Sequence, residues 1–97
     1  MTITFYRKDS SGELCFYTIH DRQQNLFTSC TFTALWGRGL SSGREKSYTF
    51  ESSTSMDEKL RELFKQRIRE GYKVLYSFAR KKRFKRMFNG IGEEKIS

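Results

Sequence analysis

Residues 28–44 read TSCTFTALWGRGLSSGR, and they contain the clearest structural pattern in the chain. Up to Trp36, small and aromatic apolar residues alternate with threonine and leucine, which is the period of a β-strand. Mostly glycine and serine follow Arg38, and these residues supply the backbone freedom of a hairpin turn. A second alternating run at 45–50 completes the pattern. The stretch therefore predicts a β-hairpin with Trp36 and Arg38 at its mouth.

The flanking segments extend this hairpin into a sheet. Apolar and polar residues alternate in three more places, which predicts strands at 2–6, 14–21 and 72–78. The first strand of the hairpin covers 27–36. Short polar turns separate the first four strands, so we expect an antiparallel meander.

The hydrophobic period changes at Ser55, where a helix is predicted over 55–70. Apolar residues then share one helical face: Met56, Leu60, Leu63, Phe64 and Ile68. Ser55 and Glu58 fit a capping box, and Gly71 fits the position after the last helical turn. Neither the helix nor the sheet can bury its apolar face alone. The expected fold class is therefore α+β, with a twisted antiparallel sheet packed on one main α-helix and a basic C-terminal extension.

The positive charge is concentrated near the C-terminus. The chain has 97 residues and a formal net charge of +8, and six cations lie between Arg80 and Arg86 without an acidic residue. The remainder is close to balance. A chain of this length fits one domain with a modest core. We expect that domain over 1–78 and a basic tail or short helix over 79–97. A basic run of this kind favours a polyanionic partner.

Several function classes lack support in the sequence. One histidine, His20, and two cysteines, Cys15 and Cys30, show no metal-ligand spacing, and no nucleophile motif or phosphate-binding loop is visible. We therefore expect no enzyme, no metal, no cofactor and no small-molecule substrate. The cysteines fit buried, reduced thiols. No signal peptide and no apolar run of about 20 residues is visible, which predicts a cytoplasmic location without membrane contact.

The tripeptide Trp36-Gly37-Arg38, in this order of strand, turn, strand and helix, resembles the WGR domain. That domain occurs in DNA-dependent poly(ADP-ribose) polymerases and in small or fused bacterial proteins. Further segments resemble the family: the aromatic strand at 16–21, Asn25-Leu26-Phe27, Tyr48-Thr49-Phe50 and the helix ending in Gly71-Tyr72. The resemblance covers roughly residues 4–72.

One departure from the family pattern lies in the hairpin turn. The family usually continues Trp-Gly-Arg-Ile-Gly and then, after a short spacer, Gly-Gln. Here Gly39 and Leu40 follow the tripeptide, and Arg44 takes the place of the Gln. The departure predicts a differently shaped turn and leaves open where Arg38 points.

The resemblance implies a non-catalytic module that binds nucleic acid, with DNA as the expected partner and duplex ends as a possible target. In the polymerases this Trp packs against the terminal nucleotide at a DNA break, and the Arg contacts other domains. No room remains here for an ADP-ribosyltransferase domain, so only a positioning or phosphate role carries over to Arg38. The expected binding residues are Trp36, Arg38, Arg44 and Lys46 at the hairpin and Arg80, Lys81, Lys82, Arg83, Lys85 and Arg86 in the tail.

The four hairpin residues also have ordinary structural interpretations, which the sequence leaves open. Trp36 fits a core position, Arg38 fits a surface ion pair, and Arg44 with Lys46 fits a solvated edge that deters strand pairing. An alternative function also stays open: a protein-interaction module that docks a partner or a second copy. It would use the hairpin and the tail's apolar stripe of Phe84, Met87, Phe88 and Ile91.

Overall fold

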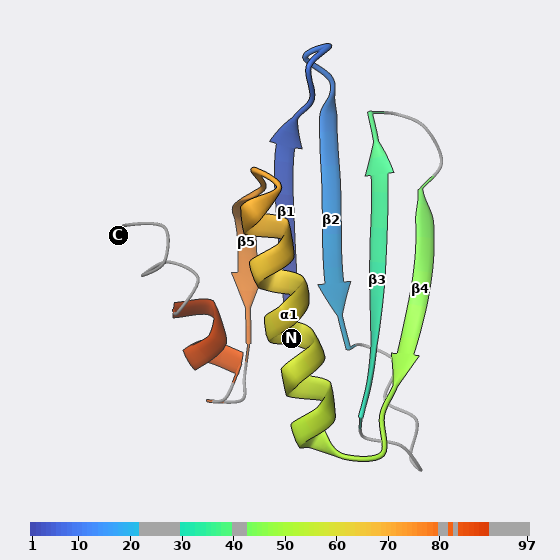
Figure 1. Ribbon diagram of the computed structural model, residues 1–97, viewed down its shortest axis with the longest axis vertical. Coiled ribbons are helices and arrows are strands. Elements are labelled where there is room, and N and C mark those ends of the chain that lie inside the picture. Colours follow the sequence, from blue (N-terminus) through green and yellow to red (C-terminus); the bar gives the residue numbers. More distant parts are fainter. Residues whose placement is uncertain (22–29, 40–42, 80–81, 83, 90–97) are drawn as a thin grey trace.

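The computed structural model describes residues 1–21, 30–39, 43–79, 82 and 84–89. Within these residues the elements are β1 (Thr2–Lys8), β2 (Leu14–His20), β3 (Thr31–Arg38), β4 (Arg44–Thr49), α1 (Ser53–Arg69) and β5 (Lys73–Phe78). The strands form one antiparallel sheet, and α1 lies across one of its faces (Figure 1). The predicted α+β class is confirmed. No helix in the described ranges is long and apolar enough to cross a membrane.

The sheet has the order β4-β3-β2-β1-β5. The first four strands form the predicted meander, and each pairs antiparallel with its neighbour. After β4 the chain crosses the sheet as α1, and β5 then pairs with the free side of β1. The two edges are therefore β4 and β5. The predicted start of the third strand, at 27, lies outside the described residues.

The core lies between the sheet and α1. Alternate residues of the three central strands point into it, so the strand period of the sequence becomes one buried face. The helical stripe meets them, and the rings of Phe5 and Phe64 lie 5.8 Å apart. Four of the five predicted stripe residues are buried, and Ile68 packs against the core while partly exposed. The buried side chains of these elements include Ile3, Phe5, Cys15, Tyr17, Ile19, Phe32, Ala34, Met56, Leu60, Leu63 and Phe64.

The N-terminus of α1 differs from the prediction. Ser52 has extended backbone angles and is the N-cap, and its hydroxyl oxygen accepts a hydrogen bond from the Ser55 N–H at 3.2 Å. Ser55 therefore lies inside the first turn, and the predicted capping box of Ser55 and Glu58 is wrong. Three serines and a threonine precede Met56, so several residues suit the cap chemically. Ser52 is the one that precedes the first helical residue, Ser53, and its backbone is extended.

The C-terminus of α1 agrees with the prediction. Gly71 has a positive φ of 92°, which favours glycine. Its N–H donates to the Ile68 carbonyl, and the Tyr72 N–H donates to the Arg67 carbonyl, both at 3.0 Å. This pair of bonds is a Schellman motif, which satisfies the last carbonyls of the helix. It also turns the chain back into β5.

Core contacts continue past β5. Residues 84–89 are helical, and Phe84 and Met87 are buried in the core. The ring of Phe88 lies 5.9 Å from that of Phe64 on α1. Part of the expected tail therefore supplies core side chains, while the boundary at residue 78 stays a prediction. Ile91 lies outside the described residues.

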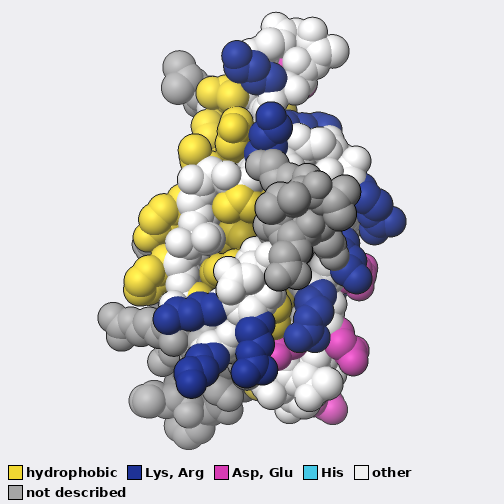
Figure 2. All heavy atoms as spheres, turned by 90° about the vertical axis from the view of Figure 1, so that its left-hand side faces the viewer, with side chains coloured by type: hydrophobic (Ala, Val, Ile, Leu, Met, Phe, Trp, Pro, Cys, Tyr) yellow, Lys and Arg dark blue, Asp and Glu magenta, His cyan; other side chains and the backbone are white. Residues whose placement is uncertain are grey.

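The other face of the sheet is not covered by α1. Hydroxyl side chains occupy much of it, with Oγ1 atoms of Thr4 and Thr18 3.0 Å apart and a similar contact between Thr33 and Ser47. Towards β5 this face becomes apolar, and Figure 2 shows the hydrophobic side chains that gather on that side of the molecule. We call the whole face of the sheet opposite α1 the open face.

Candidate nucleic-acid interface

Trp36 lies near the end of β3 on the side of the sheet that faces α1. Its indole stacks on Tyr17, with ring centroids 6.0 Å apart and planes at 20°. Tyr17 is buried, whereas Trp36 is half-buried. The indole therefore has both a packed side and an accessible side. In this geometry Trp36 can pack against the core and still present a ring face to a ligand.

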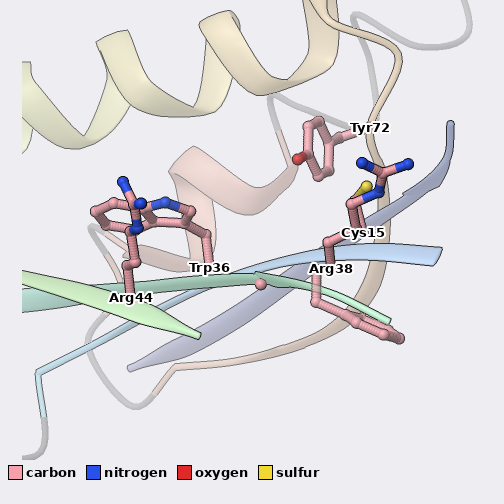
Figure 3. Close-up of a pocket in the computed structure, with 7 residues that line it drawn as sticks. Cys15, Trp36, Arg38, Arg44 and Tyr72 are labelled. Carbon is pink, nitrogen blue, oxygen red and sulfur yellow. The ribbon is translucent and has the colours of Figure 1, made fainter. Parts of the chain in front are cut away.

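A pocket of about 400 Å³ opens beside the indole. Trp36 and Arg44 lie at one end of it, and Arg38, Cys15 and Tyr72 lie at the other (Figure 3). Its lining thus combines aromatic side chains with the guanidinium groups of Arg38 and Arg44. An exposed guanidinium beside the indole, as Arg44 provides, suits a flat ligand that carries phosphate.

A second pocket, of about 390 Å³, lies on the other side of Trp36, between α1 and the strands. Lys46 and Tyr48 line it from β4, and Lys59 and Arg67 line it from α1. Trp36 belongs to both pockets and divides them. Aromatic rings and cations therefore alternate across this end of the molecule.

Strand pairing places the predicted cations of β4 beside the indole. Arg44 stands directly opposite Trp36, and Lys46 stands opposite Ala34. Residues directly opposite each other in an antiparallel pair share a face, so both cations project on the side of Trp36. Both are exposed. The turn before them needs Gly43, because a Cβ there would lie 2.8 Å from the Trp36 carbonyl oxygen.

The helix contributes cations that the sequence analysis missed. Lys46 and Lys59 both approach the ring of Tyr48, with Nζ 5.0 and 5.7 Å from its centroid. Lys59 also pairs with Glu62 at 3.4 Å. The available signal was helical spacing, since Lys59, Gln66 and Arg67 flank the apolar stripe of α1 at Leu63. That spacing alone does not tell which strand the flank will face.

Arg67 is stacked among aromatic rings. Its guanidinium lies 4.5 Å from the centre of the Tyr17 ring and 5.9 Å from that of Tyr72. Arg7 of β1 approaches Tyr72 from 4.9 Å and donates to the Glu70 carbonyl at 2.8 Å. Cations and rings thus form a continuous row that ends at the Tyr17–Trp36 stack.

Burial affects the chemistry of this row. Desolvation raises the pKa of the Tyr17 phenol, although the nearby Arg67 charge acts in the opposite direction. Tyr17 therefore stays neutral and serves as a packing surface. The Arg67 guanidinium is held by Glu70 at 3.2 Å, so it is oriented along the row.

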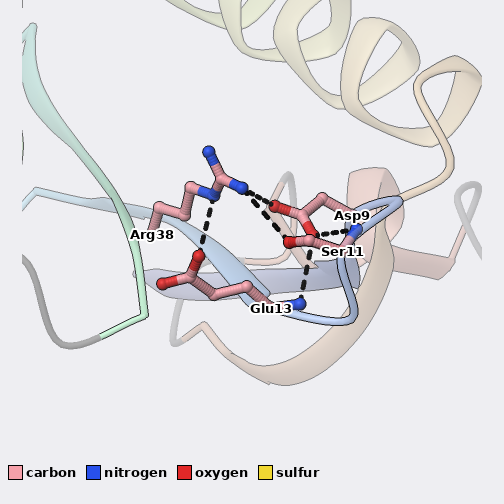
Figure 4. A network of polar contacts seen from close by, with 4 residues as sticks. All are labelled: Asp9, Ser11, Glu13 and Arg38. Atoms are coloured by element: carbon pink, nitrogen blue, oxygen red, sulfur yellow. Dashed lines mark hydrogen bonds and ion pairs between the residues drawn. The ribbon is translucent and has the colours of Figure 1, made fainter.

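Arg38 is engaged with the turn between β1 and β2 (Figure 4). Its guanidinium lies 2.6 Å from an oxygen of Asp9 and 3.1 Å from one of Glu13, and it donates to the Ser11 hydroxyl at 3.3 Å. The side chain remains 58% exposed. The carboxylates of Asp9 and Glu13 offset the charge of Arg38. This arrangement is the surface ion pair that the sequence left open as an alternative. Its geometry suits positioning of the turn better than capture of phosphate.

Asp9 organises that turn from within. One of its oxygens accepts hydrogen bonds from the Ser11 hydroxyl and from the backbone N–H groups of Ser11 and Glu13. These bonds, led by that of the Ser11 hydroxyl and aided by the charge of Arg38, lower the pKa of the Asp9 carboxyl. The ionised form of Asp9 is therefore the one that fits the turn.

The basic segment lies away from the indole. Lys82, Lys85 and Arg86 are exposed, because the helical turn directs Phe84 and Met87 inward. Arg80, Lys81 and Arg83 lie outside the described residues. Since β2 and β1 separate β3 from β5, the segment leaves the sheet about 14 Å from the strand of Trp36. The structure thus groups Arg44 and Lys46 with Trp36 and keeps the described cations of the segment, Lys82, Lys85 and Arg86, apart from them.

No group of three or more metal-ligating side chains comes together within the described ranges. Comparison with known proteins finds no curated protein and no solved structure that matches the chain. A family model does match, and it covers residues 1–87, which include the Trp36-Gly37-Arg38 hairpin, α1, β5 and the core residues Phe84 and Met87. The chain therefore belongs to the WGR domain family.

Proposed function

We propose that this protein is a non-catalytic module that binds DNA at duplex ends through the surface around Trp36. We call this the Trp36 surface and define it as Trp36, Arg44, Lys46, Tyr48 and Lys59. The observation that carries the proposal is a half-exposed indole between two pockets, with three cations at their rims. In the poly(ADP-ribose) polymerases, WGR domains are nucleic-acid-binding modules.

The chemistry of a duplex end fits this surface. The last base pair and its sugar present a flat, largely apolar face, and the phosphates lie around it. An aromatic side chain stacks on such a face, and stacking contributes roughly 1–3 kcal/mol per base. Lys and Arg at the rim neutralise phosphates and release counterions. The stack on Tyr17 fixes the indole before binding, so little side-chain freedom is lost on contact.

The basic segment at 80–86 supplies a second, less specific contribution. Its exposed members, Lys82, Lys85 and Arg86, suit backbone phosphates at a distance from the end. Arg38 acts indirectly in this proposal, because its ion pairs join the end of β3 to the turn between β1 and β2. End recognition then depends on Trp36, and general affinity depends on both cationic regions.

The alternative of a protein-docking module has less support. Its apolar stripe in the tail includes Phe84 and Met87, and these side chains are already buried in the core. Phe88 is partly buried against Phe64. Little of the described stripe remains for a partner.

The test compares Trp36→Ala with wild type on linear blunt duplex and on closed circular DNA. Affinity for the linear duplex should fall at least about fivefold, as removal of one stacking interaction implies, and affinity for circular DNA should change little. Lys46→Ala should weaken binding to both forms. Lys65→Ala is its matched control, since Lys65 is an exposed lysine of α1 outside the Trp36 surface. Equal losses for Trp36→Ala on both DNA forms, or no loss, would exclude end recognition.

A further inference from the structure

The open face carries a second candidate site, distinct from the Trp36 surface. Alternation along β1 defines it: Ile3 and Phe5 are fully buried, so Thr4 and Tyr6 point the other way. Strand register extends the face to its neighbours, because opposite residues share a side. In Figure 1, α1 lies in front of the sheet, so the open face is turned away from the viewer.

Aromatic rings gather on the open face near β5. Tyr6 stands opposite Phe16, and Tyr76 and Phe78 stand opposite threonines of β1 that point the same way. Tyr76 is 54% exposed and Phe78 is 50% exposed. Residues two apart in a strand are separated by about 7 Å, so these two rings are neighbours. Exposed rings of this size on a domain of 97 residues indicate a binding surface rather than a core.

The charges around these rings are positive. Lys8 and Lys73 are exposed on the same face, and Lys73 stands opposite Tyr6. In the described strands the only acidic residue is Glu45, which belongs to β4 at the opposite edge. The basic run begins two residues after Phe78. Figure 2 shows lysine and arginine side chains below the hydrophobic patch in the same view.

Exposed aromatic rings could bind several kinds of partner, and the positive charge around them favours one kind over the others. A second copy of the chain brings another +8 to the contact, which opposes self-association. A DNA duplex attracts the cations but keeps its bases stacked inside, away from a flat sheet. A single strand offers both phosphates and free base faces, and aromatic rings beside cations are the usual way in which proteins bind it.

We infer that the open face binds single-stranded nucleic acid, with bases stacked on Tyr76 and Phe78 and the backbone held by Lys8 and Lys73. This activity goes beyond the duplex-end contact proposed above. It uses the opposite face of the sheet and does not depend on Trp36.

Fluorescence anisotropy with a labelled oligothymidine tests the inference on the full chain. The double variant Tyr76→Ala/Phe78→Ala should bind at least about fivefold more weakly. Leu75→Ala is the matched control, because Leu75 is 58% exposed in the same strand but has no ring. It should stay within about twofold of wild type. Unchanged affinity of the double variant, or an equal loss for Leu75→Ala, would overturn the inference.

An abasic oligonucleotide of the same length gives a second measurement. It keeps the phosphates and removes the bases, so wild type should bind it at least about fivefold more weakly than oligothymidine. This comparison needs no variant and therefore tests base recognition even if the double variant unfolds, and Trp36→Ala shows whether the Trp36 surface is its source. Equal binding of both ligands would show that only charge is recognised.

Two controls separate this inference from the proposed duplex contact. The double variant should keep its affinity for linear duplex, and Trp36→Ala should keep its affinity for oligothymidine. A loss of single-strand binding in Trp36→Ala alone would place that ligand on the Trp36 surface and overturn the inference. Sedimentation should show a monomer at binding concentrations. A dimer that the double variant abolishes would instead identify the open face as a self-association surface.

Discussion

Tyr17 and Trp36 stand directly opposite each other on β2 and β3, and their rings stack at 6.0 Å. The two residues have different environments, since Tyr17 is buried and Trp36 is half-exposed. Arg67 packs on the Tyr17 ring at 4.5 Å. The core thus extends to the surface through Tyr17 and fixes the plane of the indole. A binding residue held in this way needs no rearrangement on contact.

The first prediction concerns this stack. Tyr17→Ala should remove the support of the indole and cost about 3–5 kcal/mol of unfolding free energy, as truncation of a buried ring does. Tyr17→Phe should keep the stack and most of the stability. Trp36 is the only tryptophan, so its fluorescence reports directly on its environment. Emission should shift to the red in Tyr17→Ala and stay near wild type in Tyr17→Phe. Identical spectra for both variants would show that Tyr17 does not position the indole.

The fold could be predicted from the sequence because each element has a clear period. Alternation identified the five strands, and the stripe from Met56 to Ile68 identified α1 and the face that it buries. The N-cap was misplaced because Ser52 and Ser55 have similar capping chemistry. Backbone conformation decides between them, and it depends on how β4 connects to α1.

The candidate site was less predictable, because several elements build it. Trp36, Arg44 and Lys46 lie close in sequence, and hairpin pairing brings them together. Arg67 and Lys59 reach the same region only through the packing of α1 on the sheet. The partners of Arg38 come from a turn far away in sequence. No local pattern encodes such contacts.

The second prediction concerns pH and the turn that Arg38 contacts. The pKa of Asp9 is lowered from its ordinary value of 3.8 by hydrogen bonds to its ionised form. The folded state therefore binds the proton less readily than the unfolded state. The resulting stabilisation is complete above pH 3.8 and is lost as the pH falls through the lower folded value.

Asp9→Asn should remove this part of the pH dependence. Urea unfolding of wild type and Asp9→Asn, measured from neutral pH down to about pH 2, should give curves that converge at the acid end. Glu13→Gln is the control, since Glu13 meets the same arginine without the backbone bonds of Asp9. A constant difference between wild type and Asp9→Asn at every pH would contradict the prediction.

The third prediction tests the domain boundary at residue 78. Phe84 is 1% exposed and belongs to the core cluster, so Phe84→Ala should cost about 3–5 kcal/mol of unfolding free energy. Lys85→Ala, at the exposed neighbouring position, should change it by no more than about 0.5 kcal/mol. Urea denaturation measures both. If Phe84→Ala is as stable as Lys85→Ala, the domain ends before this helix, as the sequence predicted.

The fourth prediction concerns the charges of the basic segment. Lys82, Lys85 and Arg86 are exposed, and their replacement by alanine leaves the buried side chains of the same helix intact. For each phosphate that is no longer neutralised, the slope of log K against log salt should decrease by about 0.9 on duplex DNA. The triple variant should therefore show a slope smaller by up to about 2.7 units, together with a much lower affinity.

A matched triple variant distinguishes the segment from net charge. Arg61, Lys65 and Arg69 are exposed on α1, and replacing them by alanine removes the same formal charge from another region. If the basic segment holds phosphates, the α1 variant should keep most of its slope, because charges that do not touch phosphate release few counterions. Equal decreases in the two variants would show that the attraction arises from the overall field of the protein. The basic segment would then have no special role in DNA binding, and the Trp36 surface would remain as the only proposed duplex contact.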